Sequence, residues 1–237
     1  MAIAVVGDSV SARVSGANSA NLTRNSVGAG NLLVICVSTF NTSGAAATVS
    51  DNVNAGNYTQ AYTLENPSNG WCQQYYHTNV GSGNTQVTVD PTGSSADIDF
   101  TITEISGAAL SSVLDTATTT NSGTYDNAAG GTATITTATL AQANNVAVAS
   151  MTNNGNSNAL TPDATFTQVG ENENNSSGQC YNAERKLLSS TAAVTATWAI
   201  GIAGTGMSTW TCGIGIYKEA AAGTVVTPRR MLTGMGV

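Results

Sequence analysis

The chain has 237 residues, and only 9% of them are charged, against roughly 25% in a typical soluble domain. Its formal net charge is −7, and no lysine or arginine lies between Arg24 and Arg185. Nucleic-acid grooves and anionic membrane surfaces both attract clustered cations, so this distribution argues against nucleic-acid and membrane partners. The first ten residues lack a basic segment followed by a long apolar run, so we also expect no secretory leader.

The first half of the chain reads as a series of short strands separated by Gly, Asn, Pro and Ser. We expect strands at residues 3–6, 11–14, 31–38, 58–64, 71–79, 85–89 and 98–105. Residues 31–38 are nearly all apolar, which is typical of a strand covered on both faces. Residues 97–105 alternate, which predicts that Ile98, Phe100 and Ile102 face inward and that the polar set faces water, namely Asp97, Asp99, Thr101 and Thr103.

The second half repeats this organisation after an irregular stretch. Residues 115–131 read as a loop that links the halves. Strands are then expected at residues 133–136, 145–151, 166–169, 179–188, 193–200 and 209–217. No apolar stripe with a 3.6-residue period extends over ten residues, so helices are not expected.

An internal repeat organises these strands. Segments 70–77 and 178–185 each begin with Gly and carry a Cys two residues later, and Cys72 and Cys180 are 180 − 72 = 108 residues apart. We therefore expect two related halves, roughly residues 1–110 and 130–220. One double-layer sandwich built from both halves and two small sandwiches in tandem both fit this repeat. We favour the first arrangement, because a shared core buries more apolar surface for each ordered residue.

The predicted fold is thus all-β, a single antiparallel β-sandwich with jelly-roll-like character over residues 1–222, followed by an extended C-terminal arm at residues 223–237. The arm begins with small residues, and a proline within it prevents easy continuation of a helix or central strand. Its basic and apolar side chains are candidates for docking on a partner: Pro228, Arg229, Arg230, Met231, Leu232 and Met235.

The four cysteines are compatible with two disulfides or with four buried thiols. They are Cys36, Cys72, Cys180 and Cys212. We favour buried thiols, since nothing in the sequence signals secretion and the core is large enough without cross-links.

Two motifs suggest chemistry but lack the residues that the chemistry needs. Gly7-Asp8-Ser9 resembles the nucleophile block of GDS-type esterases and lipases, yet the single histidine, His77, lies in a predicted strand far from the end of the chain. The Asn-rich segment that starts at Asp51 resembles a fragment of a calcium loop but carries too few carboxylates. We interpret both as turns and expect neither a catalytic residue, nor a metal, nor a cofactor.

Aromatic side chains are the other candidates for a ligand or interface site. They are Tyr58, Trp71, Tyr75 and Tyr76. Such side chains can stack on sugars, although in a β-sandwich they more often line the core or an interface. Burial of Trp71 and Tyr75 would count against carbohydrate binding.

The order of segments 30–34, 49–59, 71–76, 86–89 and 104–107 resembles a β-sandwich module found in hypothetical proteins of bacteriophages and bacteria. The resemblance implies a structural or surface subunit of a virion, not an enzyme. A compact acidic sandwich with a basic and apolar arm favours a capsid decoration (cement) protein, assembled in the host cytoplasm and bound to the outer capsid surface. Its expected partners are copies of itself, as in a trimer, and the major capsid protein. A carbohydrate-binding or receptor-binding tail or fibre protein is the alternative.

Overall fold

A computed structural model describes residues 2–40, 46–54, 56, 58–66, 70–92, 95–154, 159–172, 179–202 and 204–221, with only the backbone of 171–172. Every regular element within these residues is a β-strand, which confirms the predicted all-β class. All strand pairs are antiparallel.

The strands of the first half form a large sheet and a small sheet. The large sheet has the order β1-β9-β4-β7-β6, and β2 also pairs with β9. Its strands are β1 (Ala4–Val5), β2 (Val10–Ala17), β4 (Leu32–Phe40), β6 (Thr59–Asn66), β7 (Gly70–His77) and β9 (Ala96–Ser106). The small sheet has the order β3-β8-β5. Its strands are β3 (Ala20–Val27), β5 (Thr48–Asp51) and β8 (Gly83–Asp90).

The second half contains another large and another small sheet. The large sheet has the order β10-β17-β12-β15-β14, and the small sheet has the order β11-β16-β13. The large sheet comprises β10 (Thr119–Asp126), β12 (Asn145–Asn154), β14 (Thr167–Asn172), β15 (Gln179–Leu188) and β17 (Met207–Lys218). The small sheet comprises β11 (Gly131–Thr136), β13 (Leu160–Thr161) and β16 (Thr195–Ile200).

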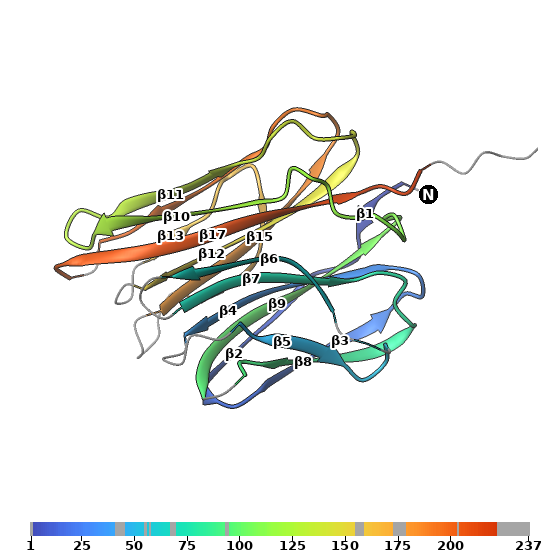
Figure 1. Cartoon of the computed structure of the whole chain (residues 1–237), viewed down its shortest axis with the longest axis horizontal. Helices are drawn as coiled ribbons and strands as arrows, with labels where there is room; N and C mark the ends of the chain where they lie inside the picture. Colours follow the sequence, from blue (N-terminus) through green and yellow to red (C-terminus); the bar gives the residue numbers. More distant parts are fainter. Residues whose placement is uncertain are drawn as a thin grey trace, which may run out of the picture.

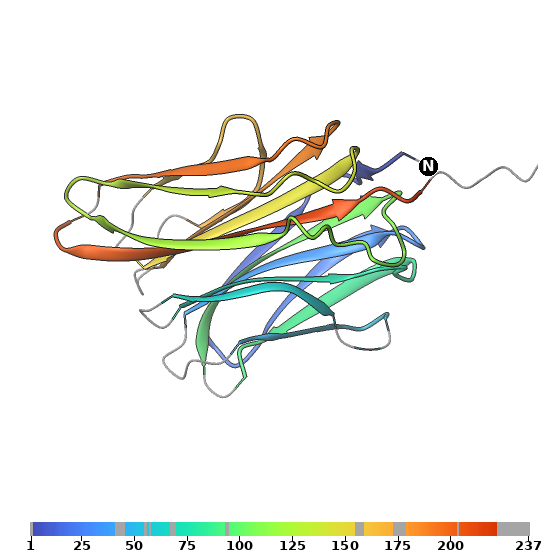
Figure 2. The same ribbon diagram turned by 45° about the horizontal axis from the view of Figure 1, so that its top comes forward.

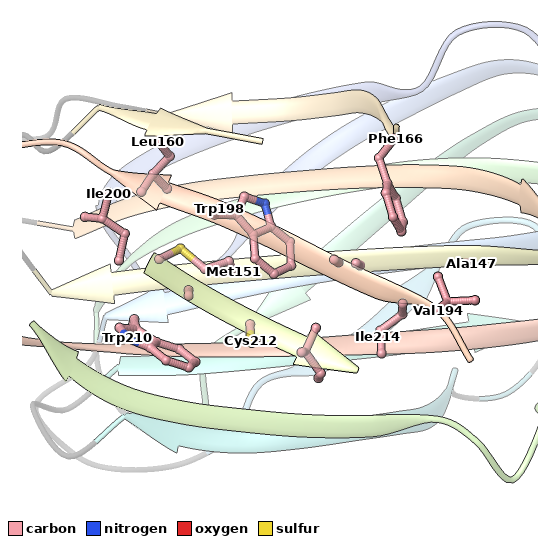
Figure 3. Packing of buried hydrophobic residues seen from close by; sticks show 14 of the residues in the cluster. Ala147, Met151, Leu160, Phe166, Val194, Trp198, Ile200, Trp210, Cys212 and Ile214 are labelled. Carbon is pink, nitrogen blue, oxygen red and sulfur yellow. The ribbon is translucent and has the colours of Figure 1, made fainter. Parts of the chain in front are cut away.

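The four sheets stack as small, large, large, small (Figures 1 and 2). Three hydrophobic clusters lie between them. One lies in the first half and contains Val37, Val87 and Phe100, and another lies in the second half around Trp198 (Figure 3). The third joins the two large sheets and includes Tyr217.

This arrangement differs from the single double-layer sandwich that we favoured from the sequence. Each large sheet is covered on both faces, by its small sheet on one side and by the other large sheet on the other. In β4, Leu33, Ile35 and Val37 pack toward the small sheet, whereas Val34 and Cys36 pack toward the other large sheet. The nearly continuous apolar run at residues 31–38 therefore has the double coverage that its composition predicts.

Two further expectations need correction. Asp99, Thr101 and Thr103 do not face water but are buried, because the second large sheet covers that face of β9. Asp97, at the start of β9, is half-buried. The supposed linking loop at residues 115–131 contains strand β10, whose sequence is polar because most of its side chains are exposed or only half-buried.

The two cysteines of the repeat also occupy different environments. Thr152 of β12, which lies 152 − 38 = 114 residues after Ser38, is compared with Ser38 of β4. Ser38 pairs with Cys72, but Thr152 pairs with Tyr181 and not with Cys180. A shift of one residue turns a strand side chain to the other face. Cys72 accordingly contacts Ser150 between the large sheets, and Cys180 packs in the second-half cluster.

Candidate functional site

Tyr58 and Tyr75 lie together at the open edge between β5 and β6. They line a shallow hollow of about 290 Å³ that also contains Gln60. Only 6% of Tyr58 and 5% of Tyr75 is exposed, so neither ring offers a face for stacking. The Tyr58 hydroxyl donates to Asp51 Oδ2 at 2.7 Å, and that of Tyr75 donates to the carbonyl of Ala47.

Burial keeps both phenols in their neutral form. Desolvation raises the pKa of Tyr75 to about 12, and desolvation together with the Asp51 carboxylate raises the pKa of Tyr58 further. Both tyrosines therefore remain neutral donors that tie loop and strand together, and they do not act as acids or bases near neutral pH.

The other two predicted aromatics do not complete one surface. Trp71 is half-buried, and its Nε1 is buried without a hydrogen-bond partner among the described residues. Tyr76 points from the opposite face of β7 and packs edge-on against Tyr217, with 5.9 Å between ring centroids. Because neighbouring strand residues face opposite sides, β7 separates Tyr75 from Tyr76.

The esterase-like block at Gly7-Asp8-Ser9 is a bend. Gly7 has a φ of +57°, which glycine adopts without steric cost. The Ser9 hydroxyl contacts Thr103 Oγ1 at 2.9 Å, while His77 Nδ1 contacts the carbonyl of Thr78 at 2.9 Å and its ring lies against Tyr58. Serine and histidine thus serve separate local contacts.

The calcium-like segment is an Asx-type turn, as predicted. Asp51 Oδ1 accepts hydrogen bonds from the main-chain amides of Val53 and Asn54, and Oδ2 accepts from Tyr58. Burial acts to raise the pKa of this carboxyl, but these hydrogen bonds outweigh it and hold the pKa below its usual value. The carboxylate oxygens are occupied by protein donors.

A buried ion pair that the sequence did not reveal fixes the N-terminal bend. Arg24 Nε lies 3.3 Å from Glu104 Oε2, and the same guanidinium donates to the carbonyls of Val6 and Asp8. Glu104 Oε1 also accepts from the amide of Gly28 at 2.8 Å. Arg24 and Glu104 are 80 residues apart in sequence, so no local pattern pairs them.

The two large sheets meet through a polar network as well as through apolar contacts. The Ser38 hydroxyl donates to Thr152 Oγ1 at 2.8 Å, and Gln179 Nε2 bonds to both hydroxyls. A second group joins the Tyr62 hydroxyl to Ser150 Oγ at 2.8 Å. Further links across the sheets run from Tyr217 to Gln74, from Gln74 to the carbonyl of Val148, and from Tyr181 to Thr101.

Three glycines allow these sheets to approach closely. A Cβ at Gly213 would overlap the ring of Tyr62, and one at Gly215 would overlap the amide of Gln74. In β14, at the edge of the same sheet, a Cβ at Gly170 would overlap the side chain of Thr101 in β9. The glycines are therefore required by packing between the sheets.

The four cysteines are free and buried, as we favoured from the sequence. Desolvation raises the pKa of Cys36 to about 11 and that of Cys72 to about 12, and it also raises the pKa of Cys212. Since the thiolate is the reactive form, these side chains act as small apolar residues.

Glu184 on β15 is a buried carboxyl with a strongly raised pKa. Its side chain is buried, and neither carboxylate oxygen has a hydrogen-bond partner there. Desolvation, with a smaller contribution from Asp163, raises its pKa to about 8. The Asp163 amide opposes this shift without reaching hydrogen-bond geometry, as does the charge of Lys186.

A groove lies between β1 and the end of β15. One part, of about 490 Å³, is lined by Ala4, Val5, Thr165, Thr167, Arg185, Lys186 and Leu187. An adjoining part of about 290 Å³ shares Leu187 and extends to Ile3 and Glu219. The groove brings together residues from the beginning of the chain, from segment 165–167, from β15 and from Glu219 near the end of the described residues.

Comparison with protein-family models finds no match, and comparison with curated proteins finds none either. No cluster of three or more potential metal-binding side chains occurs among the described residues. The same residues include no helix long and apolar enough to cross a membrane. All six residues of the predicted docking arm, from Pro228 to Met235, lie outside the described part of the chain.

Proposed function

We propose that this protein is a structural, non-catalytic subunit of a bacteriophage virion, and more specifically a capsid decoration protein. The observation that carries the proposal is that both ends of the described chain meet at one end of the sheet stack (Figure 1). The amide of Ile3 donates to Glu219 Oε1 at 3.0 Å, and the amide of Ala220 donates to the carbonyl of Gly107. Residues 223–237 therefore follow from a fixed end of the block, which suits an arm that anchors it to a capsid.

The interior supports a passive role. Groups that resemble catalytic or metal-binding residues are engaged in structural contacts: Ser9 with Thr103, Asp51 with its own turn, and Glu104 with Arg24. The hydrogen bonds between Ser38 and Thr152 and between Tyr62 and Ser150 join the two large sheets. Buried hydrogen bonds of this kind fix the two sheets relative to each other.

The outer face of the second small sheet supports contacts with neighbouring subunits. Thr136 and Thr195 pair across β11 and β16 with hydroxyl oxygens 2.9 Å apart, and Thr134 lies opposite Thr197. An uncharged face of this kind loses little solvation and meets little charge repulsion when copies associate. We propose that the virion form is a homo-oligomer, with a trimer as the first expectation.

Strand order supports our further proposal that the protein consists of two related, jelly-roll-like halves. The series β2 to β9 and β10 to β17 give the same pairing order in the large sheets, 2-9-4-7-6 and 10-17-12-15-14, and in the small ones, 3-8-5 and 11-16-13. Both large sheets also have a register shift at the same place, after Gln60 in β6 and after Gln168 in β14.

The contacts between the large sheets follow the same correspondence. When the register shifts of β6 and β14 are aligned, Tyr62 corresponds to Gly170. When the strand pair β4–β9 is aligned with the pair β12–β17, so that Ser38 corresponds to Thr152, Thr101 corresponds to Gly213. Tyr62 packs on Gly213, and Gly170 packs on Thr101, so each contact is the counterpart of the other. We infer an approximate two-fold relation between the halves, with the Ser38–Thr152 contact near its axis.

The test is binding to purified capsids that lack decoration protein. We expect the full chain to co-sediment with capsids at a fixed number of copies, and a variant without residues 223–237 to lose binding while unfolding at the same temperature. Absence of binding by the full chain, or undiminished binding by the shortened chain, would overturn the role proposed for the arm. Mass photometry of the free protein tests the trimer.

A carbohydrate-binding tail protein remains the second candidate, favoured by the hollow that contains Tyr58, Gln60 and Tyr75. The burial of both tyrosines counts against stacking on a sugar. A glycan array compares the chain with a Gln60→Ala variant, because Gln60 is an exposed polar residue of the hollow. Binding that the variant loses would favour this candidate.

A further inference from the structure

The groove beside β1 has an open strand edge on each side. In β15, Arg185 pairs with Thr167 of β14, but Lys186 and the two leucines that follow pair only with β12. On the opposite side, β1 pairs only with β9. Main-chain groups at such edges are ready to pair with an additional strand.

The larger part of the groove is also positively charged and partly apolar, whereas Glu219 lines the adjoining part. The larger part contains two charged side chains, Arg185 and Lys186, and both are cations. Leu187, between the two parts of the groove, is 58% exposed although it is a large apolar residue. In a chain with a net charge of −7, two adjacent cations beside an exposed leucine form a distinctive surface.

Neighbouring contacts hold the cations in place. Lys186 Nζ donates to Thr165 Oγ1 at 2.8 Å and lies 5.1 Å from the centre of the Phe166 ring. Arg185 Nη1 lies 3.5 Å from the carbonyl of Gly7. Asp8 favours the charged form of Arg185, although burial acts more strongly in the opposite direction and lowers its pKa.

We propose that this groove binds an extended acidic peptide segment of another protein, which adds as a strand beside Lys186–Leu188. Lys186 and Leu187 face opposite sides of β15, so acidic side chains on one face of the added strand would pair with Lys186, and apolar side chains on its other face would cover Leu187. Arg185, the preceding residue, adds to the positive potential along this edge. Charge complementarity decides between this occupant and the protein's own arm, since Arg229 and Arg230 of the arm would be repelled by the same two cations. The inference does not depend on the virion role.

The test uses a short synthetic peptide that alternates valine with glutamate. Two controls replace glutamate with glutamine or with lysine, and a third keeps the glutamates but carries N-methyl groups on alternate amides. We expect the glutamate peptide to bind by calorimetry, at least about tenfold more tightly than the glutamine peptide. N-methylation should abolish binding, because strand addition needs the amide hydrogen bonds. Amide NMR shifts should concentrate at residues 3–5 and 186–188.

A double variant, Arg185→Gln with Lys186→Gln, should weaken binding of the glutamate peptide at least about tenfold. The matched control is Lys218→Gln, a cation on another strand, which should leave affinity unchanged. Three results would each overturn the proposal: equal binding of the lysine peptide, equal binding of the N-methylated peptide, or no binding of any peptide. In the last case the cations only protect the edges from aggregation.

Deleting residues 222–237 tests whether the protein's own arm occupies the groove. Unchanged affinity for the glutamate peptide supports an external acidic partner. An affinity more than about tenfold higher after this deletion would identify the arm as the resident of the groove and would contradict the proposal.

Discussion

Replacing Glu184 with glutamine should stabilise the protein and flatten its dependence on pH. The pKa of this buried carboxyl is raised from 4.5 to about 8, with desolvation as the main cause. A folded-state pKa above the unfolded value means that the folded state holds the proton more tightly. Its contribution to stability is therefore complete below pH 4.5 and is lost as the pH rises toward 8.

The size of the effect follows from the two pKa values. Each pH unit between them costs about 1.4 kcal/mol of unfolding free energy, so the full loss approaches roughly 4–5 kcal/mol near pH 8. Glutamine keeps the shape of the neutral carboxyl and does not ionise. The Glu184→Gln variant should therefore match the native chain near pH 4.5 and exceed it by a few kcal/mol at pH 8.

Urea unfolding at several pH values measures the difference. The control is Glu65→Gln, which removes an exposed carboxyl from β6. The relevant quantity is the difference between native chain and variant, since other carboxyls such as Asp51 contribute with the opposite sign. If Glu184→Gln and the native chain lost stability in parallel between pH 5 and 8, the assignment of a buried, unpaired carboxyl would be refuted.

Three further outcomes are expected. Gly213→Ala should destabilise the protein by ~1–3 kcal/mol, because the new methyl group meets the Tyr62 ring. Adding Tyr62→Leu should restore part of the lost stability. Urea melts that show no loss of stability in Gly213→Ala would contradict close packing of the sheets. Arg24→Met should lower the unfolding free energy by ~3–5 kcal/mol, because Glu104 is left buried without its cation. The double variant Arg24→Met with Glu104→Leu should recover much of this stability. Thermal melts measure both differences. All four thiols should resist Ellman's reagent in the native protein and react only in denaturant; rapid labelling of the native chain would disprove their burial.

Strands with strong apolar patterns could be predicted from the sequence. A strand held mainly by main-chain pairing with its neighbour could not. Residues 31–38, expected as a strand covered on both faces, are found as β4, and residues 145–151, expected as a strand, are found as β12. Strand β10 was missed because it joins β17 through its main chain and buries little besides Tyr125. A polar edge strand carries no apolar periodicity by which to recognise it.

Alternation also gave only part of the answer for β9. It correctly placed Asp99, Thr101 and Thr103 on one face, but it does not say what covers that face. A second sheet covers it, and Thr101 meets the hydroxyl of Tyr181 there. The groove was likewise beyond prediction, since its walls come from β1 and β15, which are far apart in sequence.

The two large sheets pack directly against each other through glycine contacts. NOE spectroscopy on the uniformly labelled protein tests this packing most directly. We expect cross-peaks from the Tyr62 ring to the α protons of Gly213, and from the Thr101 methyl to those of Gly170. If both were missing while contacts within each pair of sheets remained, the two large sheets would not share this interface.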